Sequence, residues 1–348
     1  MRILFVLDNV PKENENYSSV LMAHHMHCQG HDVFLTDVYN LAYYPDGQMG
    51  ARAWKAKKKN YKTQQEYINE IKTEAKPNEV IKANELDVLF IRNDPSAAPA
   101  NENWSQTAGV VFGQVAVEAG VIVLNDPFTL SDSVNKMYFQ QFPEAVRPKT
   151  IITRDIQEIK DFYKDQGRII IKPLQGSGGQ GVFLVTEENK ANINSMIEAN
   201  LRDGYIIAQE YLPKAAEGDI RLFMVNGQIY EHKGKVAALH RYNDTGDARN
   251  NIHAGGKVKK VKITNQMREL AEWVRPKLIA DGIFIAGLDI AGDKLMETNL
   301  FSPGALTTIS RMEDVNFAEG ICQAIERKVD HVRIYGRNKI SNKELNVL

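Results

Sequence analysis

The stretch RIIIKPLQGSGGQGVFLV, residues 168–185, decides the fold of the middle of this chain. Gly176, Gly178 and Gly181 match the pattern G-x-G-x-x-G, which in a dinucleotide-binding fold lies directly before a helix. Here the apolar residues 182–185 follow the loop, and such a short apolar run is typical of a strand. The loop therefore closes a β-hairpin, which excludes the dinucleotide-binding interpretation.

The glycines of this loop indicate a flexible flap over phosphate groups. Backbone amides without side chains can approach a phosphate closely, and Lys172 places a positive charge at the base of the loop. Four glycines within positions 176–181 exceed the need of an ordinary turn, although a turn that requires glycine only for its φ angles is the alternative. Protein kinases use a similar cover, but no H-R-D or D-F-G segment follows it here.

A second stretch, GLDIAGDKLMETNLFSPG at residues 287–304, predicts a hairpin that carries a metal site. Glu297 and Asn299 are two residues apart and share one face of a strand, and Asp289 lies on the neighbouring strand. Side chains with oxygen atoms are costly in an apolar hairpin unless a cation lies among them. Mg²⁺ suits this role because it prefers oxygen ligands and bridges to phosphates. A plain two-residue turn would pair position 289 with 296, so a shared site requires a bulge or an odd-length loop. A solvated surface hairpin is the alternative.

Arginines lie between these two stretches and suit an anionic substrate. Asp219 and Arg221 share a strand face if the strand begins at residue 219. Arg241 and Arg249 both lie within the polar segment 240–256, which is typical of a mobile lid. Such arginines can hold a carboxylate bidentately or neutralise a phosphoryl group in transfer, and surface ion pairs are the alternative for each one.

The first part of the chain alternates between apolar strands and helices, which predicts a doubly wound, mainly parallel sheet. The expected strands are residues 3–7, 31–36, 87–91 and 121–124, and the expected helices are residues 18–29 and 107–119. The Lys-rich residues 52–84 are expected to form a solvated helical stretch because glutamates interleave its lysines.

Beyond residue 126 the pattern changes to α+β. Helices are expected at residues 130–141, 192–201, 266–280 and 317–328, and Asn226-Gly227 is a strong hairpin signal. The predicted units are residues 1–126, 127–205 with the flap, 206–330 with the metal hairpin, and a polar, mobile tail at 331–348.

Composition limits the possible functions. The 348 residues have a formal net charge of −1, so no overall field favours nucleic acid or an anionic membrane. The apolar N-terminal run lacks a cleavage site and is shorter than the roughly 20 residues of a membrane span. Two cysteines cannot form a disulfide framework, and a cytoplasmic location is expected.

The order of flap, lysine, hinge and carboxylate hairpin resembles the ATP-grasp superfamily, and within it the bacterial glutathione synthetase family. The resemblance extends from about residue 2 to residue 330. It is carried by the segments LFIRNDPSAAP, VLNDPFTLSDSVNK, IIIKPLQGSGGQG, AQEYLP, GDIRLFMVNG, RNNIHAGG and GLDIAGDKLMETN. The fold that it implies is an N-terminal sheet domain followed by two α+β subdomains that clasp ATP.

The resemblance also implies roles for individual residues. The nucleotide phosphates would be bound by Lys136 and Lys172 and covered by the flap residues Gly176, Ser177, Gly178, Gly179 and Gly181. The base would be bound by the hinge, which consists of Gln209, Glu210, Tyr211 and Leu212, and Asp219 would lie near the ribose. Two magnesium ions, or manganese in their place, would be held by Asp289, Glu297 and Asn299. Phosphoryl transfer and substrate binding would use Arg221, Arg241, Arg249 and Asn251.

The implied reaction joins γ-glutamylcysteine to glycine through an acyl phosphate and releases ADP and phosphate. The chain departs from the family pattern at Thr307, where members usually carry an arginine, and Arg311 is the nearest substitute. The alternatives are therefore a RimK-like or other peptide ligase with a different amine, or a nucleotide-binding regulatory module without turnover. No nucleic acid or membrane partner is expected, and the family suggests a homo-oligomer.

Overall fold

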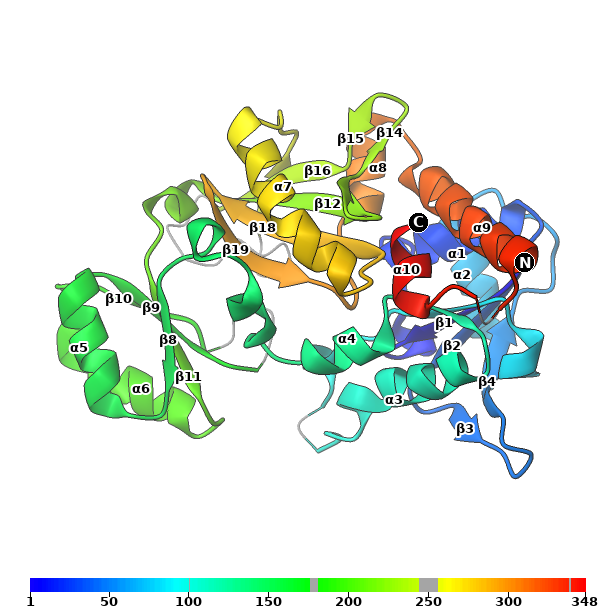
Figure 1. The fold of residues 1–348 in the computed structure, drawn as a ribbon, viewed down its shortest axis with the longest axis horizontal. Helices are drawn as coiled ribbons and strands as arrows, with labels where there is room; N and C mark the ends of the chain where they lie inside the picture. The colour runs from blue at the N-terminus through cyan, green and yellow to red at the C-terminus, as the bar shows by residue number, and fades with distance from the viewer. Residues whose placement is uncertain (100, 176–180, 244–255, 338) are drawn as a thin grey trace.

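The computed structural model describes residues 1–348 except residues 100, 176–180, 244–255 and 338. Three sheets follow one another along the longest axis of the molecule (Figure 1). The N-terminal sheet lies at one end, a central sheet lies in the middle, and a small four-stranded sheet lies at the other end. None of the helices within these described ranges is long and apolar enough to span a bilayer.

The N-terminal sheet has the strand order β3-β4-β2-β1-β6-β7, with β5 beside β4. Strands β2, β1, β6 and β7 are parallel to one another, β4 is antiparallel to β2, and the chain winds outward from β1 in both directions. This confirms the doubly wound sheet. The strands are β1 (Arg2–Leu7), β2 (Asp32–Asp37), β3 (Leu41–Tyr43), β4 (Met49–Lys55), β5 (Glu79–Lys82), β6 (Val88–Ile91) and β7 (Ile122–Leu124).

Helices cover both faces of this sheet because its strands present apolar side chains alternately to each side. Ile3 and Phe5 pack with α1 (Ser18–Cys28) and α9 (Phe317–Tyr335), whereas Leu4 and Val6 pack with α3 (Ser105–Glu118). The C-terminal helix α9 therefore shares a core with the first strand of the chain.

Two expected helices are wrong in extent. Within residues 52–84 the α-helix is α2 (Gln64–Thr73), which lies in the sequence between the antiparallel strands β4 and β5, and a 3-10 turn begins at Ala83. Buried Ala51 and Ala53 alternate with the exposed Arg52, and the charged residues hid this strand pattern from the sequence. The expected helix at 130–141 is two short pieces, α4 (Pro127–Asp132) and the 3-10 turn Tyr138–Gln141.

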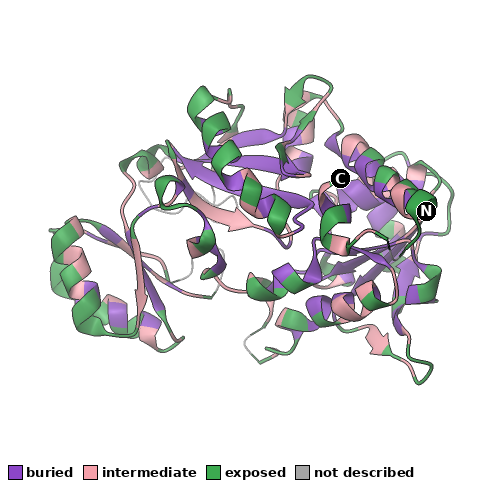
Figure 2. Cartoon of the chain, viewed as in Figure 1, coloured by how far each residue is buried: buried purple, intermediate pink, exposed green. Residues whose placement is uncertain are grey.

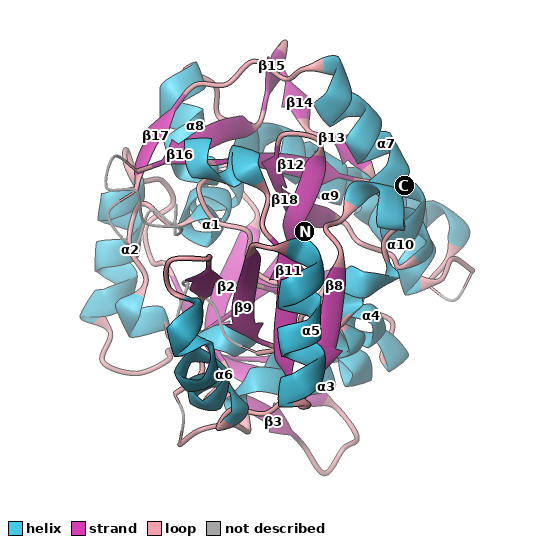
Figure 3. Ribbon diagram, turned by 90° about the vertical axis from the view of Figure 1, so that its left-hand side faces the viewer, coloured by secondary structure: helices cyan, strands magenta, loops and turns pink. Residues whose placement is uncertain are grey.

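The small sheet has the order β10-β9-β11-β8 and is antiparallel throughout. Its strands are β8 (Thr150–Thr153), β9 (Ile169–Pro173), β10 (Phe183–Val185) and β11 (Ile206–Glu210), covered by α5 (Ile156–Gln166) and α6 (Ile193–Leu201) (Figure 3). Phe183 pairs with Ile171, which confirms the hairpin around the glycine loop. Because β11 belongs to this sheet, the boundary predicted at residue 205 falls one strand too early.

The central sheet has the order β17-β16-β12-β18-β19, with β13 beside β12. Every residue of β12 and β18 is buried, and both strands lie among the buried segments in Figure 2. Helix α7 (Asn265–Ala280) packs its Val274 and Leu278 on this sheet. The strands are β12 (Asp219–Val225), β13 (Gln228–Ile229), β16 (Ala238–Tyr242), β17 (Lys257–Lys259), β18 (Ile285–Ala291) and β19 (Lys294–Asn299), and a separate hairpin contains β14 (Glu231–His232) and β15 (Lys235–Val236).

The prediction of a mobile polar tail at 331–348 is wrong. Helix α9 continues to Tyr335, and α10 (Asn342–Val347) begins with a capping box between Ser341 and Glu344. Leu345 is buried, and the buried Asn346 donates from Nδ2 to the Val123 carbonyl at 2.9 Å.

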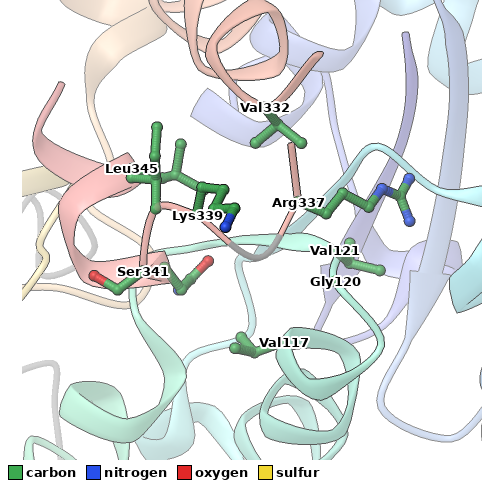
Figure 4. A pocket seen from close by; sticks show the side chains of 10 residues that line it. Val117, Gly120, Val121, Val332, Arg337, Lys339, Ser341 and Leu345 are labelled. Carbon is green, nitrogen blue, oxygen red and sulfur yellow. The ribbon is translucent and has the colours of Figure 1, made fainter. Parts of the chain in front are cut away.

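A cavity of about 350 Å³ lies between this C-terminal segment and the turn before β7 (Figure 4). It opens at the amino end of β7, the opposite edge of the sheet from the carboxyl ends of the parallel strands. Its lining includes Val117, Gly120, Val121, Val332, Arg337 and Lys339.

Asn125 ties the N-terminal sheet to both strands of the carboxylate hairpin. This buried side chain donates from Nδ2 to the Ile285 carbonyl at 2.8 Å and to the Leu300 carbonyl at 2.7 Å. Its Oδ1 accepts from the Ile285 amide at 2.8 Å. One amide therefore fixes where β18 begins and where β19 ends.

We predict that Asn125→Ala lowers the free energy of unfolding by about 3 kcal/mol, because it leaves three buried backbone groups unpaired. Urea unfolding measures this loss. The control is Asn69→Ala on the exposed face of α2, which should change stability by less than about 0.5 kcal/mol. An equal effect of both substitutions would contradict the assigned role.

Candidate active site

The hairpin of β18 and β19 contains the bulge that a shared site requires. Ala291 pairs with Lys294 across a two-residue turn, and Ile290 pairs with Leu295. The register then shifts, so that Asp289 pairs with Glu297 and Met296 is the extra residue. Directly opposite residues share a face of a sheet, which confirms the prediction about the register.

Asp289 is the centre of a buried ion cluster. Arg221, its partner on β12, contacts it bidentately, with Nε 2.5 Å from Oδ1 and Nη2 3.0 Å from Oδ2. Arg241 on β16 places Nη2 2.8 Å from Asp289 Oδ2 and also pairs with Asp219. Asn299 Nδ2 donates to Asp289 Oδ2 at 3.2 Å. The two arginines are thus buried in ion pairs, and the surface alternative is wrong for both.

The charges of this cluster separate the pKa values of its two carboxyl groups. Burial would raise the pKa of Asp289, but Arg221 and Arg241 lower it to about 2. Burial and the neighbouring charge of Asp289 raise the pKa of Asp219 to about 6, although Arg241 opposes the shift. Asp289 therefore stays ionised throughout the neutral range.

Gly218 allows the close approach between Asp219 and Arg241. Its φ is +107°, and a Cβ at this position would lie 2.0 Å from the Arg241 carbonyl oxygen. Any other residue would push β12 away from β16. Strand β12 begins at Asp219, so Asp219 and Arg221 share a face as expected.

Lys172 and Lys136 face this hairpin from the side of the small sheet. Lys172 on β9 donates from Nζ to Gln209 Oε1 at 3.0 Å, and Gln209 Nε2 donates to Thr150 Oγ1 at 3.0 Å. Lys136 Nζ lies 3.9 Å from Glu297 Oε1, and its amide donates to the Leu174 carbonyl beside the flap. The structure thus brings both lysines to the carboxylate hairpin.

Burial lowers the pKa of Lys172 to about 8. The charge of Glu297 opposes this shift, and the charge of Lys136 adds to it. The ammonium group of Lys172 is thus only partly solvated and is near the charges of both partners.

The other predicted nucleotide residues fall on the connection between the two sheets. The amides of Glu210 and Tyr211 donate to the carbonyls of Lys149 and Arg168 at 2.9 and 3.1 Å. Leu212 leads into the 3-10 turn Pro213–Glu217. Gly181 follows the flap with a φ of +70°. Six predicted residues lie outside the described residues: Gly176, Ser177, Gly178, Gly179, Arg249 and Asn251.

The segment after β19 carries Thr307 at the start of α8 (Leu306–Glu313). Thr307 is buried, and its hydroxyl has no hydrogen-bond partner within the described part of the chain. Arg311 is exposed and donates to Asn16 Oδ1 at 2.7 Å.

Arg92 is a residue of this region that the sequence analysis did not single out. It is 2% exposed and directly follows β6. Its Nη1 and Nη2 donate to the Phe301 and Pro303 carbonyls at 3.3 and 3.2 Å, and Arg221 Nη1 contacts the Gly304 carbonyl at 3.4 Å. The segment 301–304 therefore lies between two buried guanidinium groups. Its position at the carboxyl end of a parallel strand was the available signal.

Comparison with known families covers most of the chain. Residues 1–130 match the N-terminal domain of prokaryotic glutathione synthetase, and residues 135–314 match its ATP-grasp domain. Glutathione synthetase of Brucella melitensis is 34% identical over 246 residues, which cover 70% of this chain and 74% of that protein. Glutathione synthetase of Synechocystis is 28% identical over 338 residues, which cover 94% of this chain and 100% of that protein.

Solved structures share the fold at low sequence identity. The ATP-grasp ligase PsnB, complexed with a phosphomimetic precursor variant, Mg and ADP, has a TM-score of 0.58 and 16% identity over 94% of this chain and 98% of its own. The D-cycloserine synthetase DcsG has a TM-score of 0.59 and 12% identity over 93% of this chain and 99% of its own.

These likenesses confirm the predicted fold class, an N-terminal sheet domain followed by an ATP-grasp fold. ATP-grasp enzymes bind ATP and Mg²⁺, and the oxygen side chains of the hairpin suit the chemistry of that ion. The chain belongs to the prokaryotic glutathione synthetase family, and it is an ATP-dependent carbon–nitrogen ligase.

Proposed function

We propose that the chain joins γ-glutamylcysteine to glycine, with conversion of ATP to ADP and phosphate. The observation that supports this most directly is the meeting of Lys136 and Glu297 at 3.9 Å, with Lys172 beside them. Lys136 and a carboxylate on the hairpin are thus close enough to act on the same polyphosphate, and the charge of Glu297 also acts on Lys172 at the base of the flap. The named activity of the relatives supplies the substrates.

Nucleotide binding would use the base of the flap and the hinge. Lys172 and Lys136 would neutralise the phosphates, the flap at 176–181 would cover them, and the hinge backbone at Glu210, Tyr211 and Leu212 would bind the base. Gln209 is buried and holds Lys172 by a hydrogen bond, so its role would be to position that ammonium. Asp219 is buried against Arg241, so we propose that it also positions Arg241 and does not only contact the ribose.

The hairpin would hold two Mg²⁺ ions, or Mn²⁺ in their place. Glu297 and Asn299 share one face, the Glu297 side chain is 44% exposed, and Asp289 remains ionised at neutral pH. All three offer oxygen ligands, which these ions prefer. Bound there, the ions would neutralise negative charge on the phosphates.

Arginines would complete the charge balance on the substrate side. Phosphoryl transfer to a carboxylate brings anions together, so catalysis depends on positioned cations and needs no protein nucleophile. Arg221 and Arg241 are already oriented by Asp289, while Arg249 and Asn251 would contribute from the lid. The acyl phosphate hydrolyses in water, so closure of the flap and lid would protect it.

Thr307 favours a second candidate, an ATP-grasp peptide ligase with a different amine acceptor. The family arginine at this position would suit a carboxylate of the acceptor, whereas a buried threonine cannot supply a charge. Arg311 contacts Asn16 on the surface and does not replace it here. Glycine is therefore the part of the proposal that most needs a direct test.

A substrate panel tests both candidates. We expect Mg²⁺-dependent phosphate release with γ-glutamylcysteine, and a higher kcat/KM for glycine than for alanine, serine, β-alanine or short peptides. Phosphate release is measured with each amine at fixed ATP, and the product is identified by mass spectrometry. If glycine ranks no better than the other amines, the chain is a ligase of different acceptor specificity.

Lys172 provides a prediction about pH. Its pKa of about 8 means that the ammonium form dominates below pH 8 and is lost above it, and only that form attracts phosphate. The Kd for ATP with Mg²⁺ should be constant from pH 7 to 7.5 and then rise, by up to about tenfold per pH unit above the pKa. Calorimetry between pH 7 and 9.5 measures the profile.

A pair of variants isolates this effect. Lys172→Met should weaken ATP binding at pH 7 by at least about tenfold and abolish the rise with pH. The control, Lys164→Met, removes a 67% exposed lysine on α5 and should leave the profile unchanged. An unchanged pH profile in Lys172→Met would assign the titration to another group.

A further inference from the structure

The N-terminal sheet has a topological switch point between β1 and β6. From β1 the chain moves first to β2 on one side, and the later strands β6 and β7 lie on the other side. Ligands of open parallel sheets bind outside the carboxyl ends of the strands at such a point. Here Asp8 and Asn9 follow β1, and Arg92 and Asp94 follow β6.

Two carboxylates with unused acceptor capacity lie at this switch point. Asp8 Oδ1 accepts from the Asp94 amide at 2.8 Å. Glu13, in the same loop as Asp8, is 6% exposed, and its Oε2 has no hydrogen-bond partner within the described residues. Asn9 Oδ1 on this loop is likewise buried without a partner there. Buried acceptors without donors are costly, so this loop is suited to a ligand that donates.

Arg92 does not fill that role. Its Nε donates to Ser19 Oγ at 3.1 Å, and its other two nitrogens donate to the carbonyls of Phe301 and Pro303. Its charge acts on the two carboxylates only through space. Burial and the charge of Asp8 raise the pKa of Glu13 to about 8. Burial raises the pKa of Asp8 to about 7, against the hydrogen bond from the Asp94 amide and the charge of Arg92.

We propose that Asp8 and Glu13 bind the primary ammonium group of the substrate whose carboxylate is activated. This inference rests on the ligase function proposed above. An ammonium group has three donors and a positive charge. It complements a neighbouring amide oxygen and two carboxyl groups whose ionised forms its charge would favour. In γ-glutamylcysteine this group is the α-ammonium of the glutamyl part.

The position of the cluster favours the donor substrate over the acceptor. Arg92 and Arg221 both contact the segment 301–304, and Arg221 contacts Asp289. The α-ammonium of γ-glutamylcysteine lies at the opposite end from the reacting cysteine carboxylate, at a distance of roughly 7–10 Å in an extended dipeptide. An acceptor amine must instead attack unprotonated, and two carboxylates would hold it in the unreactive ammonium form.

Glu13→Gln tests the proposal because it removes the charge and keeps the size. We expect the KM for γ-glutamylcysteine to rise roughly 10- to 100-fold, with kcat and the KM for ATP unchanged. N-glutarylcysteine, which keeps both carboxylates and lacks the ammonium, is the matched substrate. Wild type should discriminate against it, and Glu13→Gln should reduce the difference in KM between the two compounds.

Matched variants separate binding from folding. Glu15→Gln removes a partly exposed carboxylate two residues away and should leave every KM unchanged. Asp8→Asn should reproduce the Glu13→Gln effect. Thermal unfolding with γ-glutamylcysteine gives a second readout, since the ligand should stabilise wild type more than Glu13→Gln.

The outcomes are distinguishable. If wild type forms no product from γ-glutamylcysteine with any amine while ATP still binds, both the proposed function and this inference are withdrawn. If wild type forms glutathione but Glu13→Gln leaves the KM for γ-glutamylcysteine unchanged, or raises it equally for N-glutarylcysteine, the inference fails alone. A rise confined to the KM for glycine would place the acceptor amine at this cluster and overturn the assignment to the donor.

Discussion

A single carboxylate, that of Asp289, sets the conditions that the rest of the active site must meet. A charge that is 95% buried requires partners, and three strands supply them through Arg221, Arg241 and Asn299. Strand β12 must start early enough to carry Arg221, and glycine must precede it so that β16 can approach. The bulge in β19 must bring Glu297 to the same face. The register of the central sheet is therefore the constraint on which the ligase chemistry depends.

The proposed chemistry divides between the three sheets. The small sheet contributes Lys172 at the base of the flap, and the central sheet contributes the carboxylate hairpin with its arginines. The N-terminal sheet contributes the loop that we propose holds the far end of the donor substrate. The segment 301–304 connects the last two, because both Arg92 and Arg221 contact it. A substrate bound at both ends would thus be aligned by parts of the chain more than 200 residues apart.

Local patterns in the sequence predicted the flap hairpin, the doubly wound sheet and the bulge, because glycine loops, apolar runs and the spacing from 289 to 297 are local signals. The misses depend on distant contacts. The capping-box pattern of Ser341 and Glu344 was a local signal for a helix at residues 342–347, but the packing of Leu345 and Asn346 on β7, which holds that helix in place, is a distant contact. The ion pair between Arg241 and Asp289 joins residues 48 positions apart. Likewise, the burial of Glu13 and Arg92 follows from tertiary packing, and no motif marks it.

The separate core of the small sheet has a thermodynamic consequence. Among the described residues, Ile159, Ile171 and Ile197 pack in a core formed by that sheet and its helices, whereas the other two cores each combine residues of the N-terminal and central sheets. If the small sheet and its helices moved as a unit relative to the central sheet, little apolar surface would be transferred into or out of water. The heat capacity change on nucleotide binding should therefore be small, since apolar burial is its main source. The binding enthalpy would then change little with temperature, and a plot of ln Kd for the nucleotide against 1/T should be nearly linear.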